Sequence, residues 1–449
     1  MRILSLFLLG TWTGMAKADL AVTNGSGSSV SVFRNTGSVG TISYAAKVDF
    51  TTGSFPYPVS IGDLDGDGKA DLALANEGSN TVSVFRNTGS AGTISYAAKV
   101  DFTTGSLPFS VSIGDLDGDG KADLAVANYS SNTVSVFRNT GSPGTISYAA
   151  KVDFTTGSGS GPNSVSIGDL DGDGKADLAV ANYNSNTVSV IRNTGSAGTI
   201  SYAAKVDFTT GFAPYSVSIG DLDGDGKADL AVANGSGSSV SVFRNTGSAG
   251  TISYAAKVDF TTGLFPYSVS IGDLDGDGKA DLAIANQSSN TVSVFRNTGS
   301  AGTISYAAKV DFATGSDPSS ASIGDLDEDG KADLAVANAS SNTVSVFRNT
   351  GSAGTISYAT KVDFATGISP LSVSIGDLDG DGKADLAVAN KGSNTVSVFR
   401  NTGSAGTISY AAKVDFAADE GSYSVSIGDL DGDGKADLAV ANYNSNTVS

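Results

Sequence analysis

The chain has 449 residues and a formal net charge of −19, with 46 acidic against 27 basic residues and neither cysteine nor histidine. These counts exclude a disulfide framework, a thiol nucleophile and the clustered basic residues of a nucleic-acid-binding protein. No apolar run after residue 20 approaches the roughly 18 residues of a membrane-spanning helix, and abundant Gly, Ser, Thr and Val favour strands and tight turns, so we expect an all-β protein.

The N-terminal residues 1–18 have two interpretations. An arginine, a short apolar stretch over 3–10 and the A-x-A sequence of 16–18 form the pattern of a secretory signal peptide. The segment 9–20 also aligns with 61–72 position by position, with three aspartates replaced, and is alternatively a decayed copy of the repeat described next. We expect a signal peptide, and therefore a secreted or cell-surface protein.

A repeat of about 52 residues occupies the rest of the chain. The string IGDLDGDGKADLA, with one Glu substitution in the sixth copy, occurs eight times, and its first aspartate stands at 63, 115, 169, 221, 273, 325, 377 and 429. Self-similarity at such a period is the signature of a repeat architecture, and the whole stretch 19–449 is expected to form one domain.

Each repeat is predicted to contain four short strands, which in the first full unit cover 59–62, 72–75, 81–86 and 94–102. The third alternates apolar and polar residues, whereas the second is apolar throughout and is expected to be covered on both faces. One four-stranded sheet cannot bury both of its faces by itself. Radial stacking of the sheets solves this, and we therefore predict a β-propeller of four-stranded blades.

Counting strands favours eight blades, with seven as the alternative. In the eight-blade arrangement, the C-terminal first strand over 424–428 joins the N-terminal strands and closes the ring. Residues 438–449 are then surplus, which suggests a chain truncated within a longer array.

The repeated loop of 63–71 presents carboxylates at its positions 1, 3, 5 and 9. Alternate residues of a tight loop direct their oxygens toward one centre, and a hard cation such as Ca²⁺ takes six to eight oxygen ligands. Gly68 at position 6 permits the sharp turn, and the Lys69 carbonyl at position 7 is a further oxygen. An EF-hand is excluded because position 12 is Leu74 rather than glutamate and because a strand follows.

Electrostatics favours a bound cation over a set of metal-free Asp-Gly turns. Two carboxylates about 4 Å apart repel by about 4 kcal/mol at an effective dielectric constant near 20, and each loop holds four. The eight loops contain 32 of the 46 acidic residues, so the acidity of the chain is explained by up to eight Ca²⁺ ions. Glu328 replaces a glycine in the sixth loop and leaves its four aspartates intact, so we expect this loop to bind as well.

The D-x-D-x-D-G-x-x-D loop, followed by LAVAN and a V-x-V strand, resembles the FG-GAP-like or VCBS repeats, which have the same blade type as the integrin alpha-subunit propeller. The resemblance implies calcium in the loop between the first and second strands of each blade. The Phe-Gly and Gly-Ala-Pro elements are absent, so an integrin-like receptor role is not supported. The implied ligands are four aspartates and one lysine carbonyl per loop: Asp63, Asp65, Asp67, Lys69 and Asp71; Asp115, Asp117, Asp119, Lys121 and Asp123; Asp169, Asp171, Asp173, Lys175 and Asp177; Asp221, Asp223, Asp225, Lys227 and Asp229; Asp273, Asp275, Asp277, Lys279 and Asp281; Asp325, Asp327, Asp329, Lys331 and Asp333; Asp377, Asp379, Asp381, Lys383 and Asp385; Asp429, Asp431, Asp433, Lys435 and Asp437.

The differences between repeats gather in two links, from fourth to first strand and from second to third strand. In an up-and-down blade both links lie on the face opposite the metal loops. Aromatic rings beside hydrogen-bonding groups suit sugar rings, so this face is a candidate site for a glycan or a protein partner, although drift in exposed loops explains the same variation. The candidate ligand-binding residues are Tyr57, Phe109, Tyr129, Tyr183, Tyr215 and Tyr267.

An enzyme is not expected. Outside the repeated acids, Glu328 and the acid at position 19, four acidic residues are left, Glu77, Asp317, Asp419 and Glu420, and the chain has no histidine or cysteine. A hydrolase or lyase is therefore the weakest alternative. The favoured function is an extracellular binding or adhesion module, and the second is a purely structural array; the sequence leaves the oligomeric state open.

Overall fold

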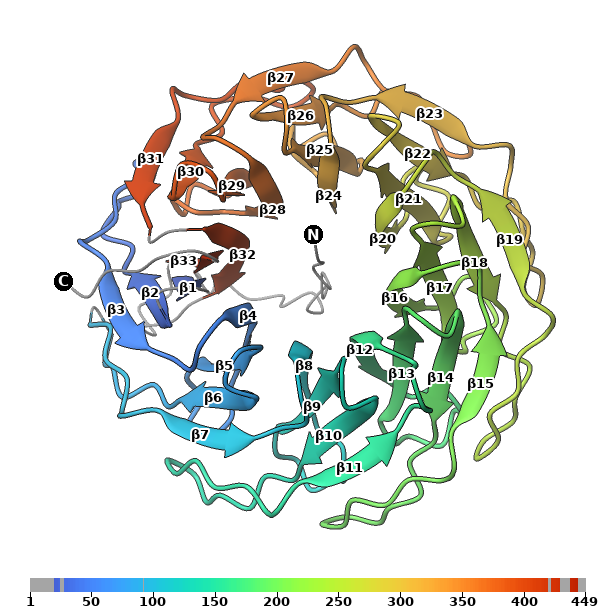
Figure 1. The fold of residues 1–449 in the computed structure, drawn as a ribbon. Coiled ribbons are helices and arrows are strands. Elements are labelled where there is room, and N and C mark those ends of the chain that lie inside the picture. The colour runs from blue at the N-terminus through green and yellow to red at the C-terminus, as the bar shows by residue number, and fades with distance from the viewer. Residues whose placement is uncertain (1–19, 25–27, 92, 419–420, 429–436, 443–449) are drawn as a thin grey trace.

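A computed structural model of the protein describes residues 20–24, 28–91, 93–418, 421–428 and 437–442. These residues form 33 strands and no helix, arranged as eight sheets around a central opening (Figure 1). The prediction of eight blades is confirmed and the alternative of seven is wrong. None of the described segments is a helix with the length and apolar character needed to cross a bilayer. The predicted signal peptide over 1–18 lies outside the described residues.

The first strand of each blade lines the central opening and the fourth lies at the outer rim, with antiparallel pairing in the order first, second, third, fourth (Figure 1). The first strands are β4 (Pro56–Gly62), β8 (Pro108–Gly114), β12 (Pro162–Gly168), β16 (Pro214–Gly220), β20 (Pro266–Gly272), β24 (Pro318–Gly324), β28 (Pro370–Gly376) and β32 (Ser422–Gly428). The second strands are β5 (Asp71–Asn76), β9 (Asp123–Asn128), β13 (Asp177–Asn182), β17 (Asp229–Asn234), β21 (Asp281–Asn286), β25 (Asp333–Asn338), β29 (Asp385–Asn390) and β33 (Asp437–Asn442), with a further copy in β1 (Leu20–Asn24).

The third strands are β2 (Ser29–Phe33), β6 (Thr81–Phe85), β10 (Thr133–Phe137), β14 (Thr187–Ile191), β18 (Ser239–Phe243), β22 (Thr291–Phe295), β26 (Thr343–Phe347) and β30 (Thr395–Phe399). The fourth strands are β3 (Val48–Thr51), β7 (Val100–Thr103), β11 (Val152–Thr155), β15 (Val206–Thr209), β19 (Val258–Thr261), β23 (Val310–Ala313), β27 (Val362–Ala365) and β31 (Val414–Ala417). The predicted fourth strand began too early, at residue 94. The segment before residue 100 instead extends a long hairpin, held by an isolated bridge between Asn87 and Tyr96.

The hydrophobic core lies between successive blades. All six residues of β9 are buried, as its apolar pattern predicted. Ala125 and Val134 of one blade pack in a single cluster with Val165 and Leu178 of the next, and the same arrangement recurs between the other described blades. Each sheet therefore buries its faces on its two neighbours, which is why the radial arrangement is stable.

The first strand begins three residues earlier than predicted, at Pro56 in β4. A β-bulge interrupts this added part of the strand. In β8, the pairing register shifts between Pro108 and Ser110, which leaves Phe109 outside the ladder. The same shift follows the proline in β12, β16, β20, β24 and β28. Bulges redirect side chains, and here one residue per blade is released from the regular alternation of the strand.

The closing blade differs from the prediction. Its strand order is β3, β2, β1, β33, β32, with β33 also paired to β2. β32 does join the N-terminal strands, but through β33, so the described part of the segment 438–449 is not surplus. Val22 of β1 and Val440 of β33 both pair with Ser31, so two copies of the second strand share one edge of β2.

We expect Leu124→Ala to destabilise the protein by about 2 to 5 kcal/mol, because Leu124 is fully buried between two blades and truncation leaves a cavity. Val152→Ala on the exposed fourth strand is the control and is expected to change stability by less than about 0.5 kcal/mol. Urea unfolding followed by circular dichroism measures both variants, and equal effects would contradict this description of the core.

Candidate metal centres

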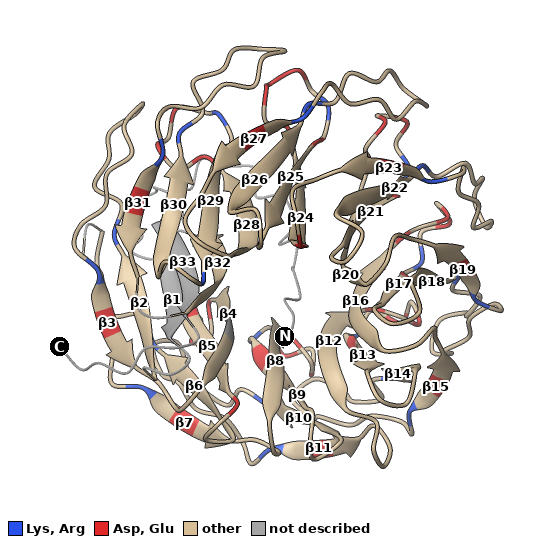
Figure 2. Cartoon of the chain, turned by 45° about the horizontal axis from the view of Figure 1, so that its top comes forward, with Lys and Arg blue, Asp and Glu red and all other residues tan. Residues whose placement is uncertain are grey.

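Seven of the eight predicted metal loops lie among the described residues. We number them in chain order from the first (63–71) to the seventh (377–385); most of the eighth, with Asp429, Asp431, Asp433 and Lys435, lies outside the described residues. Each loop connects the first strand of a blade to the second, as the sequence predicted. Acidic residues gather in these loops in Figure 2.

Backbone amides shape each loop around its first aspartate. Asp63 accepts hydrogen bonds from the amide of Gly66 (2.7 Å) at Oδ1 and from that of Gly68 (2.9 Å) at Oδ2. Gly66 and Gly68 have φ angles of 70° and 86°, in the left-handed region that glycine adopts without steric cost. The two glycines therefore favour this turn, which brings the flanking carboxylates together.

The ninth-position aspartate anchors the loop to the blade. Asp71 is fully buried, and its Oδ2 accepts the amide of Leu64 at 2.9 Å. Its Oδ1 accepts the amide of Asn87, just after β6, at 2.6 Å. The carboxylate thus ties the first hairpin to the end of the third strand. The equivalent bonds are found in the second to seventh loops.

Carboxylate oxygens converge in these loops. In the first loop, oxygens of Asp63, Asp65 and Asp71 lie within 4.8 Å of one another, and the second and third loops bring together the same positions. In the fourth loop the convergent set is Asp221, Asp223 and Asp225. The structure therefore joins aspartates from positions 1, 3, 5 and 9. These distances concern side-chain oxygens only, so the backbone carbonyl at position 7 stays a predicted ligand.

The third-position aspartate carries an oxygen with no hydrogen-bond partner. Asp65 is 5% exposed, and its Oδ2 is buried without a hydrogen bond, 3.8 Å from Nη1 of Arg86. Burial, followed by the charge of Asp67, raises the pKa of Asp65. The same orphaned Oδ2 recurs in each described loop, at Asp117, Asp171, Asp223, Asp275, Asp327 and Asp379.

These donors fit a hard divalent cation. An orphaned, buried carboxylate oxygen is costly, and one positive ion bound among three carboxylates removes both the desolvation cost and the mutual repulsion. All the side-chain donors are oxygens, which Ca²⁺ prefers, whereas structural zinc sites use cysteine and histidine.

The sixth loop departs from the others at one position. Glu328 has a φ of 58°, where the other described loops place glycine at this position. Oδ1 of Asp325 is buried without a hydrogen-bond partner, whereas Oδ1 of Asp63 accepts two backbone amides. Its four aspartates are retained, so metal binding by this loop stays a prediction.

The two variable links lie together on the opposite face. The amide of Glu77, after the second strand, donates to the carbonyl of Phe55 in the preceding link at 2.8 Å. Phe55 itself has a φ of 52°, and the residue before the proline has a positive φ in every blade that has a proline there. The amide of Leu107 is held by Oδ1 of Asn80 from the preceding blade at 2.9 Å, which fixes this strained conformation.

All six candidate ligand-binding residues were predicted to lie in links. The prediction is wrong for four of them, which lie in first strands. Tyr57, Phe109, Tyr215 and Tyr267 occupy the bulge and are only 2 to 6% exposed. Tyr129 and Tyr183 do follow second strands and are partly exposed. The bulge turns the aromatic rings toward one another, which explains why they are buried rather than displayed.

These rings form a continuous series of contacts. Ring centroids lie 4.9 to 6.5 Å apart from Tyr57 through Phe109, Tyr129, Tyr183 and Tyr215 to Tyr267. The hydroxyl of Tyr267 lies 3.3 Å from that of Tyr423, whose ring is 5.7 Å from that of Tyr57. The series therefore closes on itself.

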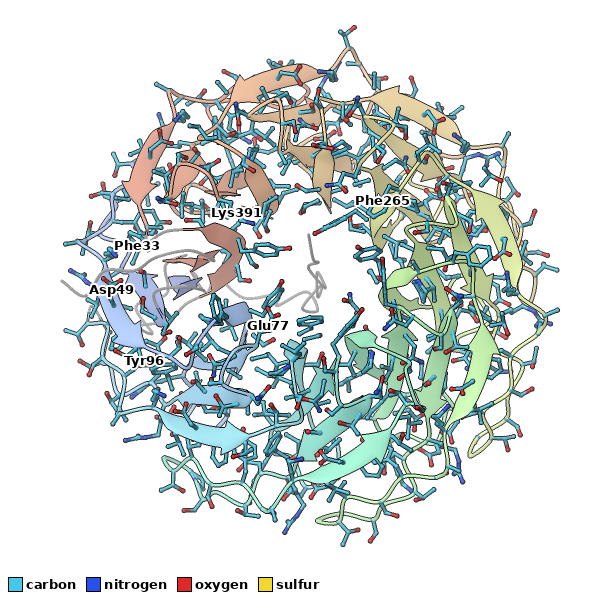
Figure 3. The ribbon with its side chains drawn as sticks, viewed as in Figure 1. Phe33, Asp49, Glu77, Tyr96, Phe265 and Lys391 are labelled. Atoms are coloured by element: carbon cyan, nitrogen blue, oxygen red, sulfur yellow. The ribbon has the colours of Figure 1, made fainter. Side chains whose placement is uncertain are left out.

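Exposed apolar side chains in the link before the first strand are not among the six candidate residues. Phe212 is 67% exposed, Leu264 59%, Ile368 58% and Phe55 43%. Phe212, Leu264 and Ile368 stand at a link position that is Ser in other repeats, and this variation is the signal that identifies them. Figure 3 shows Phe265, Glu77 and Lys391 around the central opening, whereas Asp49 lies toward the outer rim. Burial lowers the pKa of Lys391, which lies 5.6 Å from the ring centre of Tyr423.

Comparison with known families identifies one family, whose model matches the chain eight times. A family model described as FG-GAP-like repeat matches residues 16–74, 63–126, 115–180, 169–232, 221–284, 273–336, 325–388 and 377–440. Successive matches overlap by one metal loop, so the loops lie at the ends of each matched unit. No curated protein matches the chain.

Solved structures show the same fold. A putative 6-phosphogluconolactonase from Bacteroides fragilis is 17% identical with a TM-score of 0.52, and the match covers 92% of this chain and 98% of that one. An Agrocybe aegerita lectin, whose structure describes recognition of non-reducing terminal N-acetylglucosamine, is 19% identical with a TM-score of 0.50, over 78% and 90% of the two chains. At such identities the likeness concerns the fold alone.

Stability of the metal-free protein is expected to fall as pH rises from 5 to 8. Desolvation raises the pKa of Asp71 from 3.8 to about 7, and those of Asp123, Asp177 and Asp229 likewise. A carboxyl whose pKa is raised by folding stabilises the fold at low pH and loses this contribution as pH passes 7. We expect the melting temperature in excess chelator to drop by about 5 °C or more across this range. A melting temperature that rises with pH under these conditions would contradict the burial of these groups.

Proposed function

Because the chain belongs to the FG-GAP-like repeat family, we propose that it is a secreted or cell-surface propeller that binds up to eight Ca²⁺ ions. The observation that carries this proposal is the orphaned buried oxygen of the third-position aspartate, which recurs in all seven described loops. The eighth loop has the same sequence and completes the set. Extracellular modules bind calcium at roughly 10⁻⁴ to 10⁻³ M, which is useful where calcium is abundant.

Calcium in this role stabilises each blade. The ion neutralises the loop that joins the first and second strands, and the ninth-position carboxylate transmits this order to the third strand through Asn87 and its equivalents. Magnesium fits less well because it demands near-ideal octahedral geometry and retains its waters, whereas calcium accepts irregular sets of six to eight oxygens.

We further propose that the opposite face binds a ligand, either a glycan or a protein. The variable residues of otherwise near-identical repeats gather on one face, where Phe55 and Phe212 are exposed and Glu77 and Lys391 are partly buried. Apolar surfaces with a few charged and amide groups suit sugar rings and protein side chains. The lectin with a similar fold indicates that such a propeller is compatible with sugar binding.

Chelation is expected to lower the melting temperature by about 20 °C or more, because ligand binding to the folded state alone stabilises it at every occupied site. Asp171→Asn in the third loop is expected to bind one ion fewer. Asp207→Asn on the exposed fourth strand makes the same change of charge outside the loops and should bind the full number. Metal analysis and calorimetry measure these effects; a folded protein without metal at millimolar calcium would refute the proposal.

Phe212→Ala is expected to weaken binding at the variable face by about tenfold or more, since it removes an exposed aromatic ring. Val39→Ala is the control, because Val39 is also 67% exposed but lies in the hairpin between third and fourth strands. Glycan arrays and pull-down with purified cell-surface proteins provide the measurement. Equal binding by the two variants would exclude this face as the site.

A further inference from the structure

One buried asparagine per blade joins two neighbouring metal loops. Asn139 follows β10 and is 2% exposed. Its Nδ2 donates to the carbonyl of Leu64, in the first loop, at 2.6 Å, and to that of Ala122, in the second loop, at 3.0 Å. Its backbone amide donates to Oδ1 of Asp123, the ninth-position aspartate of the second loop, at 2.6 Å. A single residue thus contacts two candidate metal centres.

Both ends of this connection lie within the metal loops themselves. Leu64 stands between the candidate ligands Asp63 and Asp65, so a shift of its peptide group moves both carboxylates. Asp123, at the other end, also accepts the amide of Leu116 at 2.9 Å, and Leu116 occupies in the second loop the position that Leu64 has in the first. The bonds therefore run from loop to loop without interruption.

The same connection repeats around the propeller. The side-chain nitrogen Nδ2 of each asparagine lies 2.6 to 2.7 Å from the carbonyl oxygen of a leucine in the metal loop of the preceding blade. The pairs are Asn193 with Leu116, Asn245 with Leu170, Asn297 with Leu222, Asn349 with Leu274, Asn401 with Leu326, and Asn35 of the closing blade with Leu378. The donor and the acceptor come from different blades in every case.

We propose that these asparagines couple the calcium sites of neighbouring blades, so that an ion bound in one loop raises the affinity of the next. This inference rests on the proposed binding of calcium. An ion fixes the peptide group of the leucine and the ninth-position carboxylate, and the asparagine transfers that order across the blade interface. Buried hydrogen-bond chains polarise one another, and a neighbour that is already ordered needs less reorganisation to bind.

The third and fourth loops give the cleanest test. At the first, second and sixth loops a hairpin glycine of the following blade also donates to the third-position carbonyl, as Gly144 does to Asp65 at 3.0 Å. For the third loop, the described hydrogen bonds from the fourth blade to the loop backbone pass through Asn245, which bonds Leu170. The Leu170 side chain also packs in the apolar cluster of the fourth blade, so removing the Asn245 side chain tests the hydrogen bond and leaves this packing in place.

A terbium ion bound in the third loop can be monitored from Tyr202 once the second loop, whose Asp123 and Asp117 also act on this tyrosine, is emptied by Asp117→Asn with Asp119→Asn in every variant. The hydroxyl of Tyr202 lies 3.3 Å from the carbonyl of Ala176 in that loop. In a Trp12→Phe background, Tyr202→Trp provides a single tryptophan beside the site, and its excitation sensitises terbium luminescence there. Asp223→Asn with Asp225→Asn empties the fourth loop while Asp229, which Asn245 contacts, is kept.

Emptying the fourth loop is expected to weaken terbium binding in the third loop by about 3- to 10-fold, the value of one buried hydrogen bond. The effect should fall below about 1.5-fold when Asn245→Ala is added, as in a double-mutant cycle. Thr246→Ala is the matched control, because its hydroxyl contacts Ser253 within the same hairpin and should leave the coupling intact.

An undiminished effect in the Asn245→Ala background, or no effect of emptying the fourth loop, would overturn the coupling. Absence of terbium and calcium binding in the parent protein would instead refute the proposed function. If Asn245→Ala does not fold, Asn245→Asp keeps the volume and the oxygen that accepts the amide of Gly247, and replaces the donor by a carboxyl oxygen, which adds a negative charge when ionised. Calcium titration of the unmodified protein gives an independent check: a Hill coefficient above 1 supports the coupling, and a coefficient of 1 overturns it.

Discussion

Each blade depends on a carboxylate buried at the end of its first hairpin. Asp123 is fully buried, and its oxygens accept the amides of Leu116 and Asn139, so the metal loop, the second strand and the third strand meet at one side chain. Burial raises its pKa to about 7, because the backbone donors offset only part of the desolvation cost. The same group that organises the blade is therefore a source of instability until a cation lies nearby.

The two faces of the propeller divide the remaining roles. One face repeats the metal loops with almost no change, and Glu328 in the sixth loop is the single substitution among the described loops. The other face carries the differences between repeats, and the bulge in each first strand places one variable residue toward the central opening. Tyr57 and Tyr267 stand at this position in two blades, whereas Ser319 and Leu371 occupy the equivalent bulges of other blades. The opening is thus asymmetric despite the repeated scaffold.

Much of the architecture was predictable because it follows from short-range patterns. The period of the repeat and the alternation of its strands predicted eight four-stranded blades, and the spacing of the aspartates predicted loops with convergent oxygens. The start of the first strand was missed because Pro56 and its neighbours are typical of links rather than strands. The fourth strand was placed too early because the residues around Tyr96 alternate like a strand but form the arm of a hairpin.

The sequence by itself determined the blade type and the aspartates of each repeated loop, since both depend on neighbours within one repeat, and the number of repeats favoured eight blades. Only the tertiary structure decided which aromatic rings are buried, that two copies of the second strand pair with β2 in the closing blade, and that Asn139 reaches Leu64, 75 residues away. The physical reason is that these contacts cross from one blade to another. They depend on how the sheets twist and stack around the ring, which no local pattern of residues encodes.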